Sequence, residues 1–471
     1  MKLTKSLTVF ACCTMALIRT PNAAAQSATP APATASPTPA GPSASDRPWL
    51  DLGTFPPDFS PAPKSTPLGQ DVLSLIAPAP LDQGRIIFNM RARFEDVSQT
   101  ALNSSKALTL RTRVGYETPK WNGFYGQFVL ENTWAEDYSS YSPVPAPLNN
   151  GKAVIADTRN NQINNLFIGY AGFNSDLKAG RQDINLDNQR FVGTSDWRQN
   201  DETYDAVRLT NQALKDIWLS YTWNWQVNRI YGDYAPTPTL RRFDSNNHFL
   251  NIHYTGLPQF GTLGAYVYYL DLSGATAPRV SSAGTQPLSS TTAGVFFDGR
   301  YKFDADWALI YRAEYADQTS NHYSGPGPSY SESYNNFILG GAYQKFEAGA
   351  AYEKLGGDGT RAFQTPLATL HPFNGWANQF LTTPAIGLRD YYLWARSPLP
   401  FEMNLSAQAH YFTATTTAST YGHELDAAVS RKFGDNTTAM LKLARYWGNG
   451  APHTGVRADV TKIWLQVEFS L

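Results

Sequence analysis

The chain is 471 residues long, with 42% hydrophobic, 13% aromatic and 16% charged residues and a formal net charge of −1 at pH 7. This balance excludes a general nucleic-acid binder, which needs a surplus of basic residues to displace counterions from phosphate, so we expect no nucleic-acid partner. Two cysteines exclude a disulfide scaffold and a zinc site built from cysteine.

The amino terminus has the three parts of a secretory signal. Basic residues precede an apolar run at 7–18, and the small residues Ala23-Ala24-Ala25 follow it. We therefore predict that residues 1–25 are a signal peptide, with cleavage near Ala25. A lipoprotein signal ending at Cys12 is the less favoured alternative, because its apolar core would be very short. Both cysteines lie in the signal, so the mature chain has none, in keeping with export to an oxidising compartment.

Residues 26–80 are rich in Ala, Pro, Ser and Thr and poor in large apolar residues. Such a segment buries too little apolar surface to offset the entropy lost on ordering. We predict that it is a disordered linker in the periplasm. Residues 72–76 are apolar enough to form a short plug, and this alternative stays open, although the prolines favour a flexible tether.

From residue 81 to residue 471, polar and apolar residues alternate in stretches of about ten. The first stretch places Ile86, Phe88, Met90, Ala92 and Phe94 on one face and Arg85, Asn89, Arg91, Arg93 and Glu95 on the other. A period of two puts successive side chains on opposite faces of a strand. We therefore predict that residues 81–471 form one all-β domain.

A soluble β-sandwich would also alternate, with one face in its core. Three features instead favour a transmembrane antiparallel β-barrel. The stretches match the roughly 9–11 residues that cross a bilayer at a tilt, short and long connections alternate, and aromatic residues gather at the ends of the apolar faces. These aromatic residues are Phe94, Tyr116, Tyr170, Tyr254, Tyr315, Tyr352 and Tyr411. Short periplasmic turns and long extracellular loops are typical of outer-membrane barrels.

We predict about 18 strands, within a range of about 16 to 18. They are expected at 85–95, 107–117, 123–133, 162–171, 176–182, 204–210, 214–231, 248–256, 262–271, 292–302, 306–316, 335–344, 345–353, 389–396, 402–412, 420–431, 436–447 and 459–470. Long connections are expected at 134–161, 183–203, 272–291, 317–334 and 354–388. An even strand number places both termini on the periplasmic side.

The last strand alternates to the carboxyl terminus, from Ile463 to Leu471. This segment resembles the terminal signal that the barrel-assembly machinery reads, although such signals usually end in Phe. We therefore expect two partners, this machinery and outer-membrane lipid, and we expect the protein in the outer membrane of a Gram-negative bacterium.

Basic residues are concentrated on the polar faces of the early strands. Because polar faces point into the lumen of a membrane barrel, these side chains are predicted to line a pore. The predicted pore-lining residues are Arg91, Arg93, Arg111, Arg113, Glu131, Arg181, Arg190, Arg208, Arg312 and Glu314. An arginine ladder can pass an anion from one guanidinium to the next. Alternatively, the arginines pair with neighbouring carboxylates and stiffen the wall. Both interpretations stay open at this point.

Several short motifs resemble those of a known family. They read Gly180-Arg181-Gln182, Gln189-Arg190-Phe191, Trp197-Arg198-Gln199-Asn200, Asp205-Ala206-Val207-Arg208-Leu209, His371-x-Phe373-Asn374-Gly375-Trp376-Ala377 and Gly387-Leu388-Arg389-Asp390-Tyr391-Tyr392. Together they resemble the alginate export family of outer-membrane barrels, over about residues 82–471. The resemblance implies a barrel of the predicted strand number. It also implies an arginine-lined constriction, through which the founding member exports an anionic polysaccharide.

We therefore predict an outer-membrane channel of the alginate export type, which passes anionic solutes or an anionic polysaccharide. The connections at 183–203 and 354–388 are expected to gate it. One alternative is a general or substrate-specific porin for uptake of small solutes. A structural or adhesive barrel without conductance is another.

We predict no catalytic residue, metal site or cofactor. Asp183-x-Asn185-x-Asp187-Asn188 begins like a calcium loop, but the glycine and the Glu that such a loop needs are missing. Ser406 and His410 share a strand face, but they lie about 13 Å apart along the strand and no third orienting group is evident. The chain is therefore not expected to be an enzyme.

Overall fold

The computed structural model describes residues 84–145, 148–272, 275–277, 286–321, 330–449 and 458–471. The predicted signal peptide at 1–25, the linker at 26–80 and the plug considered at 72–76 lie outside these residues. The chain divides into two units, Met1–Ala40 and Gly41–Leu471, and the fold described below belongs to the second.

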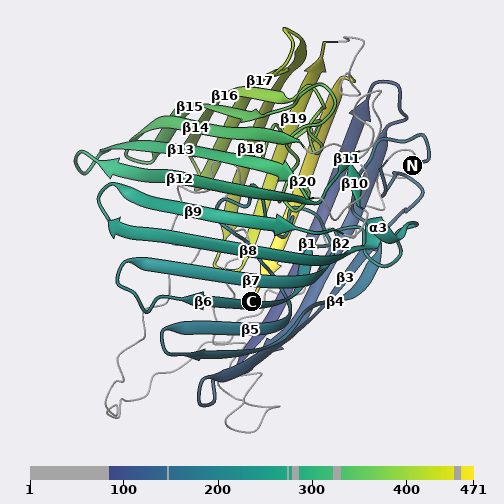
Figure 1. Cartoon of the computed structure of the whole chain (residues 1–471). Coiled ribbons are helices and arrows are strands. Elements are labelled where there is room, and N and C mark those ends of the chain that lie inside the picture. Colours follow the sequence, from purple (N-terminus) through teal and green to yellow (C-terminus); the bar gives the residue numbers. More distant parts are fainter. Residues whose placement is uncertain (1–83, 146–147, 273–274, 278–285, 322–329, 450–457) are drawn as a thin grey trace. The chain divides into compact units, whose positions relative to one another are not determined.

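Within the described residues, 18 antiparallel strands form one sheet, in which each strand pairs with its neighbours along the chain and β1 pairs with β20. Figure 1 shows their order. The strands are β1 (Arg85–Gln99), β2 (Ser105–Glu117), β3 (Phe124–Ala135), β4 (Asn160–Gly172), β5 (Ser175–Gln182), β6 (Thr203–Asn211), β7 (Ile217–Asn228), β8 (Arg242–Leu257), β9 (Gly261–Leu270), β12 (Ser290–Lys302), β13 (Trp307–Ser320), β14 (Ser331–Tyr343), β15 (Phe346–Leu355), β16 (Leu388–Leu399), β17 (Met403–Thr413), β18 (Thr420–Phe433), β19 (Thr437–Gly448) and β20 (Val460–Ser470). Two short strands, β10 (Thr276–Ala277) and β11 (Gln286–Pro287), and a short helix, α3 (Pro238–Arg241), lie in the connections. Among the described residues, no helix is long and apolar enough to cross a membrane.

The predicted all-β, antiparallel transmembrane barrel of 18 strands is confirmed. The predicted strand positions differ from the observed ones mainly at β8, which begins at Arg242 rather than near residue 248. Tight turns join every second pair of strands. Between β4 and β5 the turn is Phe173-Asn174, whose φ angles of 52° and 54° are those of a type I′ hairpin turn.

The sheet closes where the first and last strands meet. β1 and β20 pair from Asn89 opposite Ser470 to Gln99 opposite Val460, and the Leu471 amide donates to the Phe88 carbonyl at 2.9 Å. Closure leaves no strand edge, which lipid requires because an unpaired N–H or C=O group in hydrocarbon is costly.

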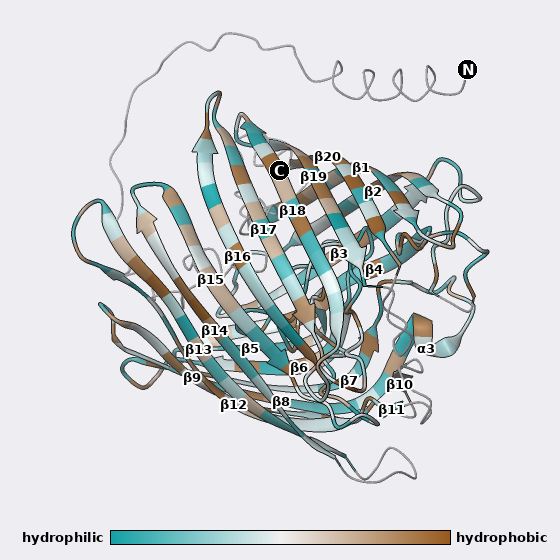
Figure 2. Ribbon diagram, turned by 90° about the horizontal axis from the view of Figure 1, so that it is seen from above, coloured by the Kyte–Doolittle hydropathy of each residue, from teal (hydrophilic) through white to brown (hydrophobic). Residues whose placement is uncertain are grey.

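The two faces of the sheet differ as the alternation predicts, and Figure 2 shows hydrophilic and hydrophobic residues alternating along the strands. Outward apolar side chains are exposed, as at Ile168 (74%) and Leu393 (63%). Inward polar side chains are buried, as at Arg93 and Arg111 (both 0%). A buried charge needs a partner, so the inward face must supply hydrogen-bonding groups of its own.

Two long connections, 183–202 between β5 and β6 and 356–387 between β15 and β16, pack on the inward face. The ring of Phe191 lies 5.3 Å from Tyr266 and 5.2 Å from Tyr334 on the wall, and 5.8 Å from Phe363 on the other connection. The Gly193 amide donates to the carbonyl of Leu367 at 2.8 Å. The two connections therefore fill part of the lumen as one layer, and we call them the luminal loops.

A glycine pair on the wall makes room for an inward tryptophan. Gly340 on β14 lies opposite Gly349 on β15, and the Trp394 side chain from β16 covers both. A Cβ atom at Gly340 would lie 2.4 Å from Trp394 Cζ2, whereas one at Gly341, on the outward face, would meet nothing within 4 Å. The two neighbouring glycines thus differ only in what they face.

We expect Gly340→Ala to destabilise the barrel by about 1–3 kcal/mol, because the added methyl group must displace the buried Trp394 ring. The free energy of urea unfolding, followed by the mobility of unboiled protein on a gel, measures this. The matched control is Gly341→Ala, which should leave the unfolding midpoint nearly unchanged. Equal effects of the two substitutions would contradict the packing described here.

Candidate functional site in the barrel lumen

Strand register gathers the predicted arginines. Arg91 on β1 lies opposite Arg111 on β2, and the other neighbour of Arg91 is Glu468 on β20. Arg113 lies opposite Glu131 on β3. Residues far apart in the sequence therefore meet on one inward patch. We call Arg91, Arg93, Arg111, Arg113 and Arg198 the arginine cluster.

Glu468 is the shared partner of two arginines in this cluster. Its two carboxylate oxygens lie 3.0 Å from Arg91 Nε and 3.1 Å from Arg111 Nη2. The Asn89 amide donates to the same carboxylate at 2.8 Å. One acidic side chain thus bridges two guanidinium groups that face each other across the β1–β2 pair, and these groups would otherwise repel.

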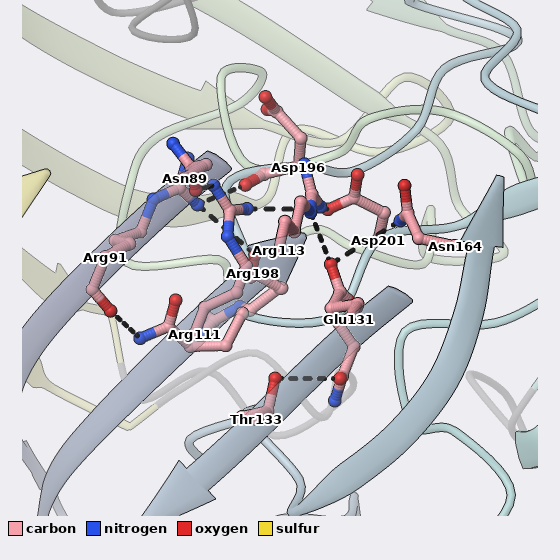
Figure 3. Close-up of polar contacts among 12 residues, drawn as sticks. Asn89, Arg91, Arg111, Arg113, Glu131, Thr133, Asn164, Asp196, Arg198 and Asp201 are labelled. Atoms are coloured by element: carbon pink, nitrogen blue, oxygen red, sulfur yellow. Dashed lines mark hydrogen bonds and ion pairs between the residues drawn. The ribbon is translucent and has the colours of Figure 1, made fainter. Parts of the chain in front are cut away.

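The remaining strand arginines also have partners, several of which are drawn in Figure 3. Arg113 Nε lies 2.6 Å from Glu131, and the other side of its guanidinium contacts Asp201 of a luminal loop. Arg93 lies 3.5 Å from Asp157 and donates to the Gln466 side chain on β20.

The first luminal loop is bonded directly to this cluster. Arg198 pairs with Glu95 on β1 at 3.1 Å, and Arg91 donates to the backbone carbonyl of Asp196 at 2.6 Å. The Asn200 side chain accepts from Thr133 on β3 and donates to the Thr158 carbonyl. The loop is therefore held by charge and by amide contacts together.

Arg190 joins the two luminal loops to the opposite wall. Its guanidinium lies 2.6 Å from Glu353 on β15 and donates to Thr365 and to the Asn374 side chain, both in the second loop. Gly375 follows in a left-handed conformation (φ 83°), and a Cβ there would lie 2.3 Å from Glu424 Oε2. The Asn-Gly pair of the motif thus allows the loop backbone to approach the wall.

Arg312 and Glu314 form a separate inward group on β13. Arg312 lies 2.6 Å from Asp298 and 2.8 Å from Glu314, and Glu314 also accepts from the hydroxyl of Tyr266 at 2.7 Å. All of these side chains except Tyr266 are carried by neighbouring strands β12 and β13. This arginine is neutralised within the wall.

The motif at 180–208 also has a structural basis. Arg181 lies on the outward face, because its cross-strand neighbour on β4 is the outward Leu166 (49% exposed), so the prediction that Arg181 lines the pore is wrong. It makes a two-pronged contact with Asp205 on β6, at 2.7 Å and 3.0 Å. The Gln182 side chain donates to the Ala206 carbonyl. Gly180 has a φ of 129°, and it lies so close to β4 that a Cβ atom there would be 2.3 Å from the Leu166 carbonyl oxygen. Most of this motif therefore secures β5 between its neighbours.

Arg208 differs from the other predicted arginines. It lies on the inward face beside Lys178, its cross-strand neighbour on β5. Arg208 reaches the Ser220 hydroxyl at 3.4 Å, and Lys178 lies 5.0 Å above the Phe167 ring. Within the described residues, neither makes an ion pair with a carboxylate. The nearby Asp176 instead accepts from the Tyr125 hydroxyl at 2.7 Å.

A cage of aromatic rings surrounds Lys442 on β19. Its ammonium group lies 4.2 Å from the ring of Trp197 and 3.7 Å from that of Trp376, one from each luminal loop. Lys442 Nζ also donates to His371 Nε2 at 2.7 Å, and His371 stacks on Trp197 at 4.2 Å. Burial, and then the neighbouring ammonium, lower the pKa of His371 well below its usual value. The neutral imidazole can therefore accept this hydrogen bond.

The first luminal loop carries a carboxyl at each end, and the Glu202 side chain is buried whereas Asp183 is exposed. Asp183 lies near the side chain of Asn165, and Glu202 accepts from the Tyr204 hydroxyl at 3.2 Å. Burial raises the pKa of Glu202 to about 7.

The remaining candidates have structural partners. Asp187 of the calcium-like sequence binds His253, Asn251 and Tyr268 on the wall, and in the described part of the chain no group of three or more His, Cys, Asp or Glu side chains could hold a metal ion. His410 does have an orienting group, Asp390 at 2.9 Å, which the sequence analysis missed because it lies on the neighbouring strand. The other ring nitrogen of His410 contacts Gln408 rather than Ser406.

The sequence analysis missed three further residues of the lumen. Lys178 shares the alternation that identified Arg208, so a search for lysine as well as arginine on inward faces would have found it. Lys442 carries the same signal on β19. Asp157 lies in a connection, where no periodicity indicates which side chains turn inward.

One protein family matches the sequence of the barrel. A family model described as alginate export matches residues 83–325, which is more than half of the chain. The motifs at 180–208 fall inside this match, and those at 371–392 fall beyond it. No curated protein sequence matches the chain.

Solved porin structures share the fold at low sequence identity. OccK9 (OpdG) of Pseudomonas aeruginosa has a TM-score of 0.62 and 13% identity, covering 83% of this chain and 99% of that one. OccAB3 of Acinetobacter baumannii has a TM-score of 0.62 and 10% identity, with coverage of 83% and 100%. OpdK of Pseudomonas aeruginosa, solved with vanillate, has a TM-score of 0.61 and 12% identity, with coverage of 83% and 99%.

We expect the first luminal loop to loosen as the pH rises. Glu202 has a higher pKa in the packed loop than in water, so the packed loop binds its proton more tightly and loses stability as pH rises from about 4 to about 7. Between pH 6 and pH 8 the opening equilibrium should shift on the order of tenfold, measured as mean current through single barrels. The variant Glu202→Gln should respond much less, and an unchanged pH response in this variant would contradict this account.

We also expect Trp197→Ala to release the luminal loops. The substitution removes the partly buried ring that contacts Lys442, His371 and Arg93, and its loss should cost up to about 3 kcal/mol, the lower end for a tryptophan-to-alanine change. The mean single-channel current in planar bilayers should rise. Trp121→Ala, at an exposed turn position, is the control. If both variants conduct like the unmodified protein, the cage does not hold the loops.

Proposed function

This chain belongs to the alginate export family, and from that membership we propose that its barrel is an outer-membrane channel that passes anionic solutes or an anionic polysaccharide. The family and the porin-like fold are those of channels rather than enzymes. We propose that the charge of the solute is negative and that particular inward cations contact it.

The observation that carries the proposal is the cation pair Lys178 and Arg208. Two like charges that lie directly opposite each other on neighbouring strands repel, so both would stabilise an anion between them. Guanidinium and ammonium groups bind carboxylate through charge-assisted hydrogen bonds. Within the described wall neither side chain forms an ion pair, and Asp176, the carboxylate that acts on both, is hydrogen-bonded to Tyr125, so we propose that a solute can contact them.

We assign a different role to the other predicted pore-lining arginines. Acidic partners neutralise six of them, Arg91, Arg93, Arg111, Arg113, Arg190 and Arg312. A buried arginine that is already neutralised has little charge left to offer a passing anion. We propose that these pairs shape the constriction and anchor the loops, while Glu131 and Glu314 serve as their counter-charges.

Uptake of small solutes is the second candidate. Two observations favour it over export of a polymer. The luminal loops are packed on the wall through Arg190 and the Lys442 cage, so a polymer would have to displace them, and OpdK, which shares the fold, was solved with the small molecule vanillate. Both candidates share the anionic step at Lys178 and Arg208. Recognition of β20 by the barrel-assembly machinery stays a prediction.

Reversal potentials under a salt gradient across planar bilayers test the proposal. The protein should prefer anions, and Lys178→Gln/Arg208→Gln should lower the ratio of anion to cation permeability several-fold, because each lost cation weakens anion binding by roughly 1 kcal/mol. The control is Lys302→Gln/Lys345→Gln, which removes the same charge from exposed positions at the turns. Cation preference in the unmodified protein, or equal effects of the two double variants, would overturn the proposal.

A further inference from the structure

The outward face of β14 to β19 carries an unbroken row of ring-bearing side chains. Each is the cross-strand neighbour of the next: Phe337, Tyr352, Tyr391, Tyr411, His423 and Trp447. Three of them, Phe337, Tyr391 and Tyr411, are between 46% and 49% exposed. In a membrane barrel such a row marks the boundary between hydrocarbon and headgroups. The row therefore locates the lipid headgroups near the long-loop end of these strands.

Two cations face outward just beyond this row. Lys354 on β15 and Arg389 on β16 are cross-strand neighbours, each two residues closer to the long loops than Tyr352 and Tyr391. Lys354 donates to the Ser333 hydroxyl at 3.0 Å. Arg389 donates to two backbone carbonyls of the connection between β17 and β18, at 2.8 Å and 2.9 Å.

In the part of the chain that the structure describes, neither of these two cations forms an ion pair with a carboxylate, although Glu332 on β14 is close enough to attract Lys354. Asp317, an acid on the outward face two strands away from Lys354, is near the Ser331 hydroxyl at 3.2 Å. Like charges placed directly opposite each other are unfavourable, so an external anion at the headgroup level would stabilise the pair.

An apolar groove lies on the hydrocarbon side of the same row. Its floor is made of small outward side chains, Ala395, Ala407, Ala409 and Ala427, on three neighbouring strands. Leu393 (63% exposed) and Leu425 (54% exposed) stand at its sides. A groove of this kind in hydrocarbon suits an acyl chain, and the cations above it suit a phosphate.

We propose that Lys354 and Arg389 bind the phosphate of a phosphorylated lipid, with an acyl chain of that lipid in the alanine-floored groove. The charges are complementary, because a phosphate accepts hydrogen bonds from guanidinium and ammonium groups together. In the orientation expected for the family, this lipid belongs to the outer leaflet. The site requires only that the barrel is in a membrane, so it is independent of the solute that passes through the lumen.

Native mass spectrometry of the full-length barrel in detergent, titrated with bisphosphorylated lipid A, tests the proposal. The unmodified protein should retain the lipid, and Lys354→Gln/Arg389→Gln should bind it on the order of tenfold more weakly. Lipid A without its phosphates should bind the unmodified protein about as weakly. The control variant Lys302→Gln/Lys345→Gln, altered at the opposite end of the strands, should bind as the unmodified protein does.

Three results would overturn the proposal. Equal binding of phosphorylated and dephosphorylated lipid A would show that the phosphate is not recognised. Equal weakening by the two double variants would reduce the effect to general surface charge. Displacement of the lipid by millimolar inorganic phosphate would indicate a site for free anions. Before binding is measured, each variant is run on a gel with and without heating. A folded barrel migrates more slowly after heating than before it.

Discussion

A sheet that crosses lipid must close on itself, and in this protein one strand pair supplies the closure. The pairing of β1 with β20 removes the last free edge, and it also places Glu468 beside Arg91 and within reach of Arg111. The backbone requirement of the membrane and the charge requirement of the lumen are thus met by the same contact. The loop residues Asp196 and Arg198 then bond to groups that this contact has already fixed in place.

The inward cations form two groups, which differ in whether a carboxylate pairs with them. Those of the arginine cluster, with Arg190 and Arg312, have carboxylates from neighbouring strands or connections, and such pairs are better evidence for a defined geometry than for added stability. Lys178 and Arg208 lie in the same wall without such partners. We therefore propose that each interpretation of the inward arginines applies to different residues, with conduction and rigidity in separate parts of the lumen.

Much of the fold could be predicted from the sequence, because a barrel strand has a simple rule of alternation. The rule identified Arg91, Arg113 and Glu131 as inward and adjacent in chain order. It could not identify the pairing of Arg190 with Glu353, because Arg190 lies in a luminal loop, where neither period nor register constrains a side chain. Lys178 and Lys442 followed the rule and were missed only because arginine was sought.

The closing contact also has a consequence for the order of assembly. Glu468 lies in the last strand to be synthesised, and Arg91 and Arg111 lie in the first two. Until β20 docks, those guanidinium groups face each other without their shared counter-ion. They must therefore stay hydrated, and the inward face of the β1–β2 hairpin keeps its water. Contacts spanning almost the whole chain form late and slowly. Dehydration of the lumen is therefore coupled to completion of the ring, and a barrel that fails to close keeps a wet, positively charged inner face.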